Sequence, residues 1–205
     1  MQNNAIVKSW HSGQDMSVLN SIHLFDVNVS IYERDISKLE AELQYLLEQG
    51  IDFRSSGSTS DILNALKEEV QSNGNGVLQD IRVLLECFRD LSKLDSFRLF
   101  LATVQSDMCR RFHTDMNDLR LLCTYCGPGT LWLDEGNVNR EALTALEPNE
   151  KIVIDESKIK QASAGDVLVL KGEVYPGMNS KAVVHRSPSI KSNSTKRLIL
   201  RIDTN

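Results

Sequence analysis

The sequence has few cysteines, no dense run of basic residues and no long hydrophobic run. Only four cysteines occur in 205 residues, which is too few for a small secreted scaffold held together by disulfides. No apolar run approaches the roughly 18 residues that a membrane-spanning helix needs. The first residues also lack the apolar core of a signal peptide, so we expect a cytoplasmic protein with reduced thiols.

The charge balance argues against one class of partner. The formal net charge is −5 at pH 7, whereas binding to a phosphate backbone needs clustered lysine and arginine. Neither nucleic acid nor a membrane is therefore an expected partner, and we expect a small-molecule or protein substrate. Composition and charge do not indicate the oligomeric state.

The first half of the sequence has the apolar spacing of helices. Apolar residues recur at helical intervals over residues 36–47, and Gly50 ends that pattern. Residues 54–60 are predicted to be a polar loop that leads into a second helix ending near Val70. A third helix is predicted from Val77 to about residue 94. Residues 1–95 are therefore expected to form a helical region.

After residue 95 the pattern becomes typical of β-strands. Several short strands separated by Gly, Pro and Asn turns indicate a sandwich or a barrel. We expect the loops at 134–139 and 187–196 to form one mouth of it, and residues 96–205 to make one compact unit with the N-terminal helices. The predicted strands are residues 97–104, 111–115, 119–125, 130–133, 167–170, 182–186 and 197–203.

A histidine and an aspartate two positions apart mark the candidate site. His113 and Asp115 lie in a segment predicted to be extended, where side chains two apart point to the same side. His185 follows much later, at the end of a predicted strand. Two histidines and one carboxylate can bind a metal on one face and leave adjacent positions open, as mononuclear iron(II) oxygenases require. Taken alone, however, a His-x-Asp triplet is also common at exposed strand ends.

The last predicted strand carries two arginines on one face. Arg197 and Arg201 point to one side, while the apolar residues between them point to the other. A buried arginine needs an anionic partner, and a dicarboxylate such as 2-oxoglutarate offers a carboxylate that a guanidinium can hold through two parallel hydrogen bonds. Pairing with Asp203 on a solvated sheet face explains the same pattern. The sequence does not indicate which arginine would bind the co-substrate.

The segment that ends in Cys126 allows a further interpretation. Cys123 and Cys126 have a spacing at which paired thiolates bind zinc or form a disulfide. No second pair follows, and packing in the core explains a strand cysteine equally well. Tyr125 precedes a Gly-Pro-Gly turn and is a candidate contact for the co-substrate, although aromatic residues at strand ends also serve simply to pack.

Residues 109–132 and 184–188 resemble domain-of-unknown-function family 1826, a bacterial family without an assigned reaction. The resemblance extends over most of the chain. More distantly, the order of His113, Asp115 and His185 before an arginine-bearing strand resembles the double-stranded β-helix of 2-oxoglutarate-dependent iron(II) oxygenases. This resemblance implies an α+β fold, in which a jelly-roll or cupin-like barrel has the N-terminal helices packed outside it.

The distant resemblance also implies roles for individual residues. His113, Asp115 and His185 would bind iron(II), and Arg197 or Arg201 would hold the distal carboxylate of 2-oxoglutarate. We therefore predict a dioxygenase-like protein that depends on iron(II) and 2-oxoglutarate. The substrate is not identified by the sequence, because the loops that would select it carry no recognisable motif.

Two other functions fit the same sequence. A non-catalytic protein would bind zinc or iron with the same triad, with Cys123 or Cys126 nearby. Some members of family 1826 are encoded near zinc-homeostasis genes, so the resemblance implies a link to metal homeostasis for such a protein. Alternatively, the acidic helices would bind a protein partner, and the barrel would serve as their scaffold.

Overall fold

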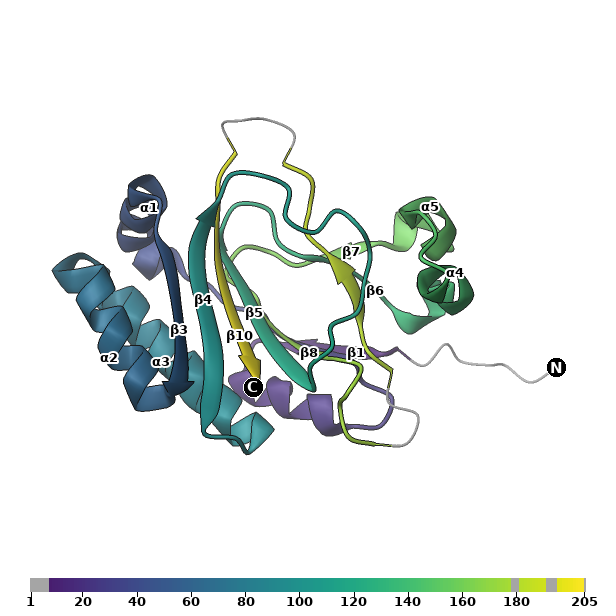
Figure 1. The fold of residues 1–205 in the computed structure, drawn as a ribbon, viewed down its shortest axis with the longest axis horizontal. Coiled ribbons are helices and arrows are strands. Elements are labelled where there is room, and N and C mark those ends of the chain that lie inside the picture. The colour runs from purple at the N-terminus through teal and green to yellow at the C-terminus, as the bar shows by residue number, and fades with distance from the viewer. Residues whose placement is uncertain (1–7, 178–180, 191–194, 205) are drawn as a thin grey trace.

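The computed structural model describes residues 8–177, 181–190 and 195–204 as two β-sheets with helices around them (Figure 1). In the larger sheet, β1 runs parallel to β2 and the other neighbouring strands are antiparallel. Its strands are, in spatial order, β1 (Trp10–Gly13), β2 (Val29–Tyr32), β8 (Val167–Lys171), β5 (Leu119–Cys126), β10 (Arg197–Thr204), β4 (Ser96–Val104) and β3 (Asp52–Ser58). The smaller sheet consists of β7 (Lys160–Gln161), β6 (Leu131–Leu133) and β9 (Val184–Arg186).

Helices cover the outer face of the larger sheet (Figure 1). They are α1 (Glu40–Gln49), α2 (Thr59–Val70) and α3 (Asn75–Ser92), with the 3₁₀ helices η1 (Met16–His23), η2 (Ser37–Leu39) and η3 (Gln71–Gly74). Beside the smaller sheet lie α4 (Arg140–Thr144) and α5 (Asn149–Ile152), with η4 (Glu135–Asn137) and η5 (Glu156–Lys158). No helix among the described residues is both long and apolar enough to cross a membrane.

Side chains on the larger sheet alternate between two faces. On β10, Leu198, Leu200 and Ile202 are fully buried and pack in the core on the helix side. Arg197 and Arg201 of the same strand line a pocket on the opposite side. This is the alternation that a two-residue period produces, and the prediction from the sequence is confirmed for this strand.

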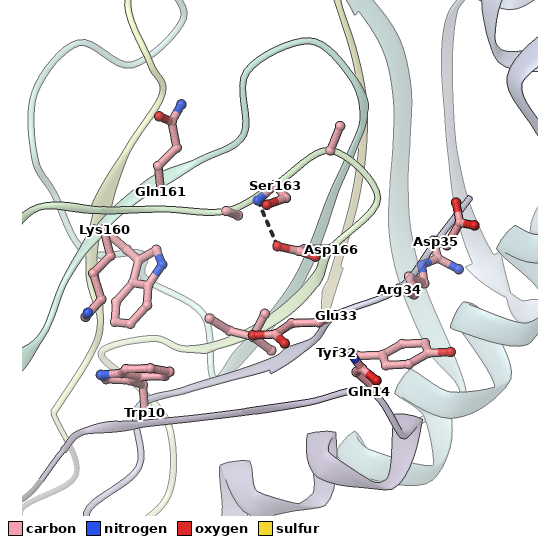
Figure 2. A pocket seen from close by; sticks show the side chains of 14 residues that line it. Trp10, Gln14, Tyr32, Glu33, Arg34, Asp35, Lys160, Gln161, Ser163 and Asp166 are labelled. Carbon is pink, nitrogen blue, oxygen red and sulfur yellow. Dashed lines mark hydrogen bonds between the residues drawn. The ribbon is translucent and has the colours of Figure 1, made fainter. Parts of the chain in front are cut away.

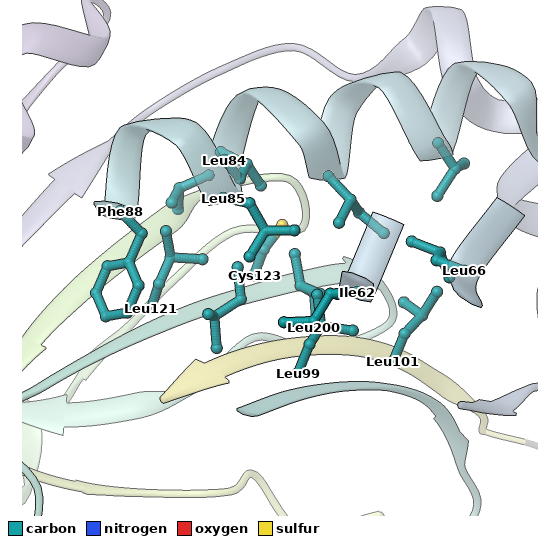
Figure 3. Packing of buried hydrophobic residues seen from close by; sticks show 14 of the residues in the cluster. Ile62, Leu66, Leu84, Leu85, Phe88, Leu99, Leu101, Leu121, Cys123 and Leu200 are labelled. Carbon is teal, nitrogen blue, oxygen red and sulfur yellow. The ribbon is translucent and has the colours of Figure 1, made fainter. Parts of the chain in front are cut away.

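The helix side of the sheet is an apolar core (Figure 3). Leu85 and Phe88 of α3 pack with Leu121 of β5 and Leu99 of β4. Burial of each such side chain contributes about 1.5–3 kcal/mol to the free energy of folding. The core explains why the helical periodicity of residues 77–91 could be recognised in the sequence: the apolar stripe of α3 is the part that contacts the sheet.

The space between the two sheets is divided into an apolar and a charged part. Ile31 of β2, Leu168 of β8 and Leu122 of β5 pack there against Trp132 of the smaller sheet. Over β10 and β4, the same face of the larger sheet carries arginines instead. The candidate metal ligands lie in this charged part of the space between the sheets, away from the apolar part.

Several predicted elements are confirmed and two are wrong. The helices and most strands lie within a few residues of the predicted ranges, and Gly50 ends α1 in the left-handed conformation, with φ of 69°. The predicted loop at 54–60 is wrong, because residues 52–58 form β3, an edge strand whose mostly polar side chains hide its period. The predicted strand at 111–115 is also wrong, because only His113 pairs there, in a single bridge.

The N-terminal part of the chain contributes to the larger sheet as well as to the helices. Strands β1, β2 and β3 all precede residue 96 and belong to that sheet. Their contribution was not expected from the sequence, because β1 and β2 are only four residues long and short segments show little periodicity. The proposed division of the chain at residue 95 itself stays a prediction.

A largely buried ion pair connects α3 to the segment that follows β2. The guanidinium of Arg34 donates two hydrogen bonds to the carboxylate of Asp80, at 2.5 and 3.0 Å, and a third to the backbone oxygen of Gly165. The hydroxyl of Tyr125 donates to the same carboxylate at 2.6 Å. Burial, followed by the nearby Cys123 and Asp80, raises the pKa of Tyr125 well above its ordinary value. Asp80 is thus the shared acceptor for two groups in the helix-side layer.

We expect Asp80→Ala to destabilise the protein by about 3 kcal/mol, because it leaves the charge of Arg34 buried without its partner. Urea denaturation followed by circular dichroism measures this change. Asp90→Ala is the matched control, since Asp90 lies on the same helix with its side chain 75% exposed, and it should change stability by less than about 0.5 kcal/mol. Equal losses in the two variants would contradict a role for the buried pair.

Candidate metal centre

Three candidate ligands meet between the two sheets. His113 lies in the connection from β4 to β5, and its backbone exchanges two hydrogen bonds with that of His185 on β9, at 3.1 and 3.0 Å. Asp115 follows two residues later. Its Oδ2 lies 3.3 Å from Nε2 of His185, and its Oδ1 lies 3.7 Å from Nε2 of His113. The structure therefore brings together the three residues that the sequence predicted as metal ligands.

Backbone carbonyls determine which nitrogen of each ring faces the group. Nδ1 of His113 lies 2.9 Å from the oxygen of Arg111, and Nδ1 of His185 lies 3.4 Å from the oxygen of Val183. A carbonyl oxygen can only accept, so each Nδ1 carries the proton and donates it. Each Nε2 then keeps a free lone pair on the side of Asp115. Metal-binding histidines are typically oriented in this way by a partner at the other ring nitrogen.

The protonation and bonding of the group fit a divalent cation. Burial is the main cause that lowers the pKa of His185 to about 4, against the opposing effect of Asp115, so the ring is neutral as metal binding requires. Oδ2 of Asp115 is buried and accepts no hydrogen bond from the described residues. A buried acceptor without a partner costs about 1–3 kcal/mol. One ligand atom from each of the three residues lies within 4.8 Å of the others, so a single ion can reach all three.

Arg120 supports the carboxylate of the group from behind. Its Nη1 lies 2.5 Å from Oδ1 of Asp115, and its Nε lies 2.5 Å from Oδ1 of Asp203 on β10. The arginine therefore links the loop that carries Asp115 to two strands of the larger sheet. Arg120 was not predicted from the sequence. It could have been found in the same way as Arg197 and Arg201, because it too is a charged residue within an otherwise apolar strand.

The two arginines of β10 have different surroundings. Arg197 is 1% exposed and donates to the backbone oxygen of Pro128 at 2.7 Å and to Oγ1 of Thr124 at 3.3 Å. No carboxylate of the described residues contacts it, and burial lowers its pKa to about 10. The side chain of Arg201 is 39% exposed, and its Nε lies 3.1 Å from Oδ2 of Asp203. Arg197 is thus the buried arginine that lacks an internal counter-ion.

One pocket is lined by the two histidines of the triad and by Arg197. It encloses about 70 Å³ and is lined by both histidines, by Arg197 and by apolar side chains that include Leu122 and Ile199. A buried positive charge and a metal-binding group therefore face the same space. A ligand with two acidic ends can contact both.

The structure does not bring Tyr125, Cys123 or Cys126 into this group. Tyr125 packs in the core on the helix side, where its hydroxyl contacts Asp80. The predicted contact of Tyr125 with a co-substrate is wrong. It requires the side chain to lie on the face of the sheet that carries the triad, whereas alternation along β5 places it on the helix side. Cys123 also lies on the helix side, and burial raises its pKa to about 12, so it remains a thiol. Cys126 packs against the same core.

A second, wider groove lies beside β1 and β7 and is separate from the triad (Figure 2). It measures about 830 Å³, and its lining includes Trp10, Trp132 and Lys160. Asp166 in this groove accepts a hydrogen bond from the backbone nitrogen of Ser163 at 2.7 Å, drawn as a dashed line in Figure 2. None of the candidate ligands or arginines of β10 lines it.

Two solved structures have the same fold. One is the dioxygenase for auxin oxidation 1 from Arabidopsis thaliana in complex with 2-oxoglutarate, with a TM-score of 0.52 and 8% identity over 94% of this chain and 90% of that chain. The other is a prolyl-4-hydroxylase from Pseudomonas putida, with a TM-score of 0.52 and 9% identity over 93% of both chains. At such identities the likeness shows the fold alone. It confirms the predicted α+β architecture, a jelly-roll barrel with helices outside it.

Sequence comparisons place the chain in a family. A search of curated proteins found no match. The family described as "Protein of unknown function (DUF1826)" matches residues 13–203, which covers the segments that suggested this resemblance. The chain therefore belongs to the DUF1826 family, and it shares its fold with the dioxygenase and the prolyl-4-hydroxylase described above.

Proposed function

We propose that this protein is an iron(II)- and 2-oxoglutarate-dependent dioxygenase that oxidises a small molecule. The observation that carries the proposal is the pocket that His113 and His185 share with the buried, uncompensated Arg197. A metal-binding triad alone suits many functions. A triad facing an arginine that lacks a counter-ion suits a co-substrate that bridges the two.

The triad would hold the metal through Nε2 of His113, Nε2 of His185 and the carboxylate of Asp115. When bound, iron(II) and 2-oxoglutarate supply the chemistry in which one oxygen atom of O₂ enters the substrate and the other enters succinate, with release of CO₂. Arg120 keeps the carboxylate of Asp115 oriented by its ion pair. The backbone carbonyls at Nδ1 of both rings keep the imidazoles in the metal-binding tautomer.

Arg197 would bind the distal carboxylate of 2-oxoglutarate. Its Nε donates to the oxygen of Pro128, and one hydrogen of its Nη2 is directed to Oγ1 of Thr124. Nη1 and the second hydrogen of Nη2 would pair with a carboxylate. Even with its pKa lowered to about 10, the guanidinium is charged at neutral pH. An isolated buried charge is costly, so an anion in the pocket offsets that cost. Arg201 is less suited, because Asp203 already contacts it.

The lining of the pocket would exclude water. Leu122 and Ile199 are at most 9% exposed, and Phe100 is 8% exposed. A low-dielectric wall strengthens the ion pair between Arg197 and a carboxylate. It also protects reactive species from side reactions with solvent.

The alternative function is a non-catalytic protein that binds zinc or iron at the triad. It gains no support from Cys123 or Cys126, because both pack against the core on the helix side. It also leaves Arg197 without a role. Retained zinc together with no affinity for 2-oxoglutarate is the result that would favour it.

We expect anaerobic titration with iron(II) and then 2-oxoglutarate to produce the visible charge-transfer absorption of the chelated complex. His185→Ala should abolish it. Arg197→Ala should weaken 2-oxoglutarate binding by roughly 30-fold or more, because loss of one partner of a buried charge pair costs about 2–5 kcal/mol. The matched control is Arg201→Ala, for which we expect less than about fivefold, as for a partly exposed pair. Equal effects of the two arginine variants would refute the assignment of Arg197.

We expect Arg120→Lys to weaken iron(II) binding by about 10-fold. Lysine keeps the positive charge but lacks the planar fork that bridges Asp115 and Asp203. Binding of iron(II) to the metal-free protein measures the effect, and the thermal transition of the same sample separates it from unfolding. Unchanged affinity for iron(II) with a lowered transition temperature would mean that Arg120 serves only the stability of the fold.

A further inference from the structure

A groove of about 490 Å³ opens beside the pocket of the candidate metal centre. Its walls come from β3, β4 and β10, and its lining includes Arg54, Arg98 and Arg201. Phe100, Met108 and Arg201 line both the groove and the pocket. The two cavities therefore adjoin at these three side chains.

Strand register places two of these arginines on either side of one ring. Phe100 on β4 is paired with Arg54 on β3 and with Arg201 on β10, and residues directly opposite in antiparallel strands share a face. The guanidinium carbons lie 5.0 and 5.3 Å from the centre of the Phe100 ring. An aromatic face attracts a cation without neutralising its charge. The ring therefore positions both guanidinium groups. Arg54 also pairs with Asp52, but this pair is exposed and weak, with side chains 70% and 60% exposed, so Arg54 can still bind an anion.

Positive charge exceeds negative charge around the two cavities. No Asp or Glu occurs among the described residues that line them. Three carboxylates outside the lining, those of Asp52, Asp115 and Asp203, make ion pairs with three of the arginines. Three more arginines contact no carboxylate of the described residues, although the chain as a whole has a net charge of −5. The lining arginines are Arg54, Arg98, Arg120, Arg186, Arg197 and Arg201.

We propose that the substrate of the dioxygenase is a small organic anion, a carboxylate or a phosphate monoester, whose charged group binds Arg54 and Arg98 in this groove. Guanidinium groups bind both kinds of oxyanion through paired hydrogen bonds. The volume of the groove lies in the range of small-molecule sites. Phe100 and Met108 supply apolar contacts for the uncharged part of the molecule, which would extend toward the triad. This inference rests on the function proposed above.

The test measures binding of phenyl phosphate, phenylacetate and the neutral 2-phenylethanol to the metal-free protein by calorimetry. We expect the two anions to bind and 2-phenylethanol to bind at least about 10-fold more weakly. The tighter of the two anions identifies a phosphate or a carboxylate as the preferred charged group. In the double variant Arg54→Ala/Arg98→Ala, anion binding should fall by roughly 10-fold.

The matched control is the double variant Arg82→Ala/Arg89→Ala. Both residues are exposed on α3, so it removes the same charge without touching the groove. An equal loss of anion binding in this control, or equal binding of 2-phenylethanol by the wild-type protein, would overturn the proposal. If the anions bind as expected but no complex with iron(II) and 2-oxoglutarate forms, the groove is an anion site and its assignment to an oxygenase substrate is wrong. If that complex forms but the anions do not bind, only the present inference fails.

Discussion

The candidate site depends on two backbone hydrogen bonds between His113 and His185. They join the long connection after β4 to the smaller sheet, and they bring two rings together with their centroids 4.7 Å apart. Asp115 then follows from chain geometry, since it lies two residues beyond His113 and is held from the other side by Arg120. Backbone pairing therefore brings the two histidines together, and side-chain contacts only add Asp115 to them.

Alternation along the strands gives the larger sheet two different faces, one that packs in the core and one that carries the candidate site. Its helix side is a continuous apolar core in which Leu200 and Phe88 are fully buried. Its other side changes across the strands, from apolar over β2 and β8 to arginine-rich over β10 and β4. The charged part remains compatible with a stable fold, because Arg120 and Arg201 have carboxylate partners and the apolar core is on the opposite face.

Sequence patterns predicted the helices and strands that bury a regular apolar stripe. They failed for an edge strand with few buried side chains and for a segment that pairs at a single residue. The apolar period predicts the helix at residues 75–92, whereas the polar side chains of β3 predict a loop, because an edge strand needs few apolar side chains. His113 forms one bridge instead of a strand, yet its role as a candidate ligand was still predicted. The prediction of a ligand rests on the histidine itself and on its spacing from Asp115, so it does not depend on whether the segment forms a full strand.

The sequence by itself determined the candidate ligands and the two faces of β10, because both depend on residue identity and on a local period of two. Only the tertiary structure decided that Arg197 lacks a carboxylate partner among the described residues, that Arg120 holds Asp115, and that Tyr125 faces the helices. These properties depend on contacts between segments far apart in the chain. Charge compensation and burial are set by such contacts, and no single segment contains them.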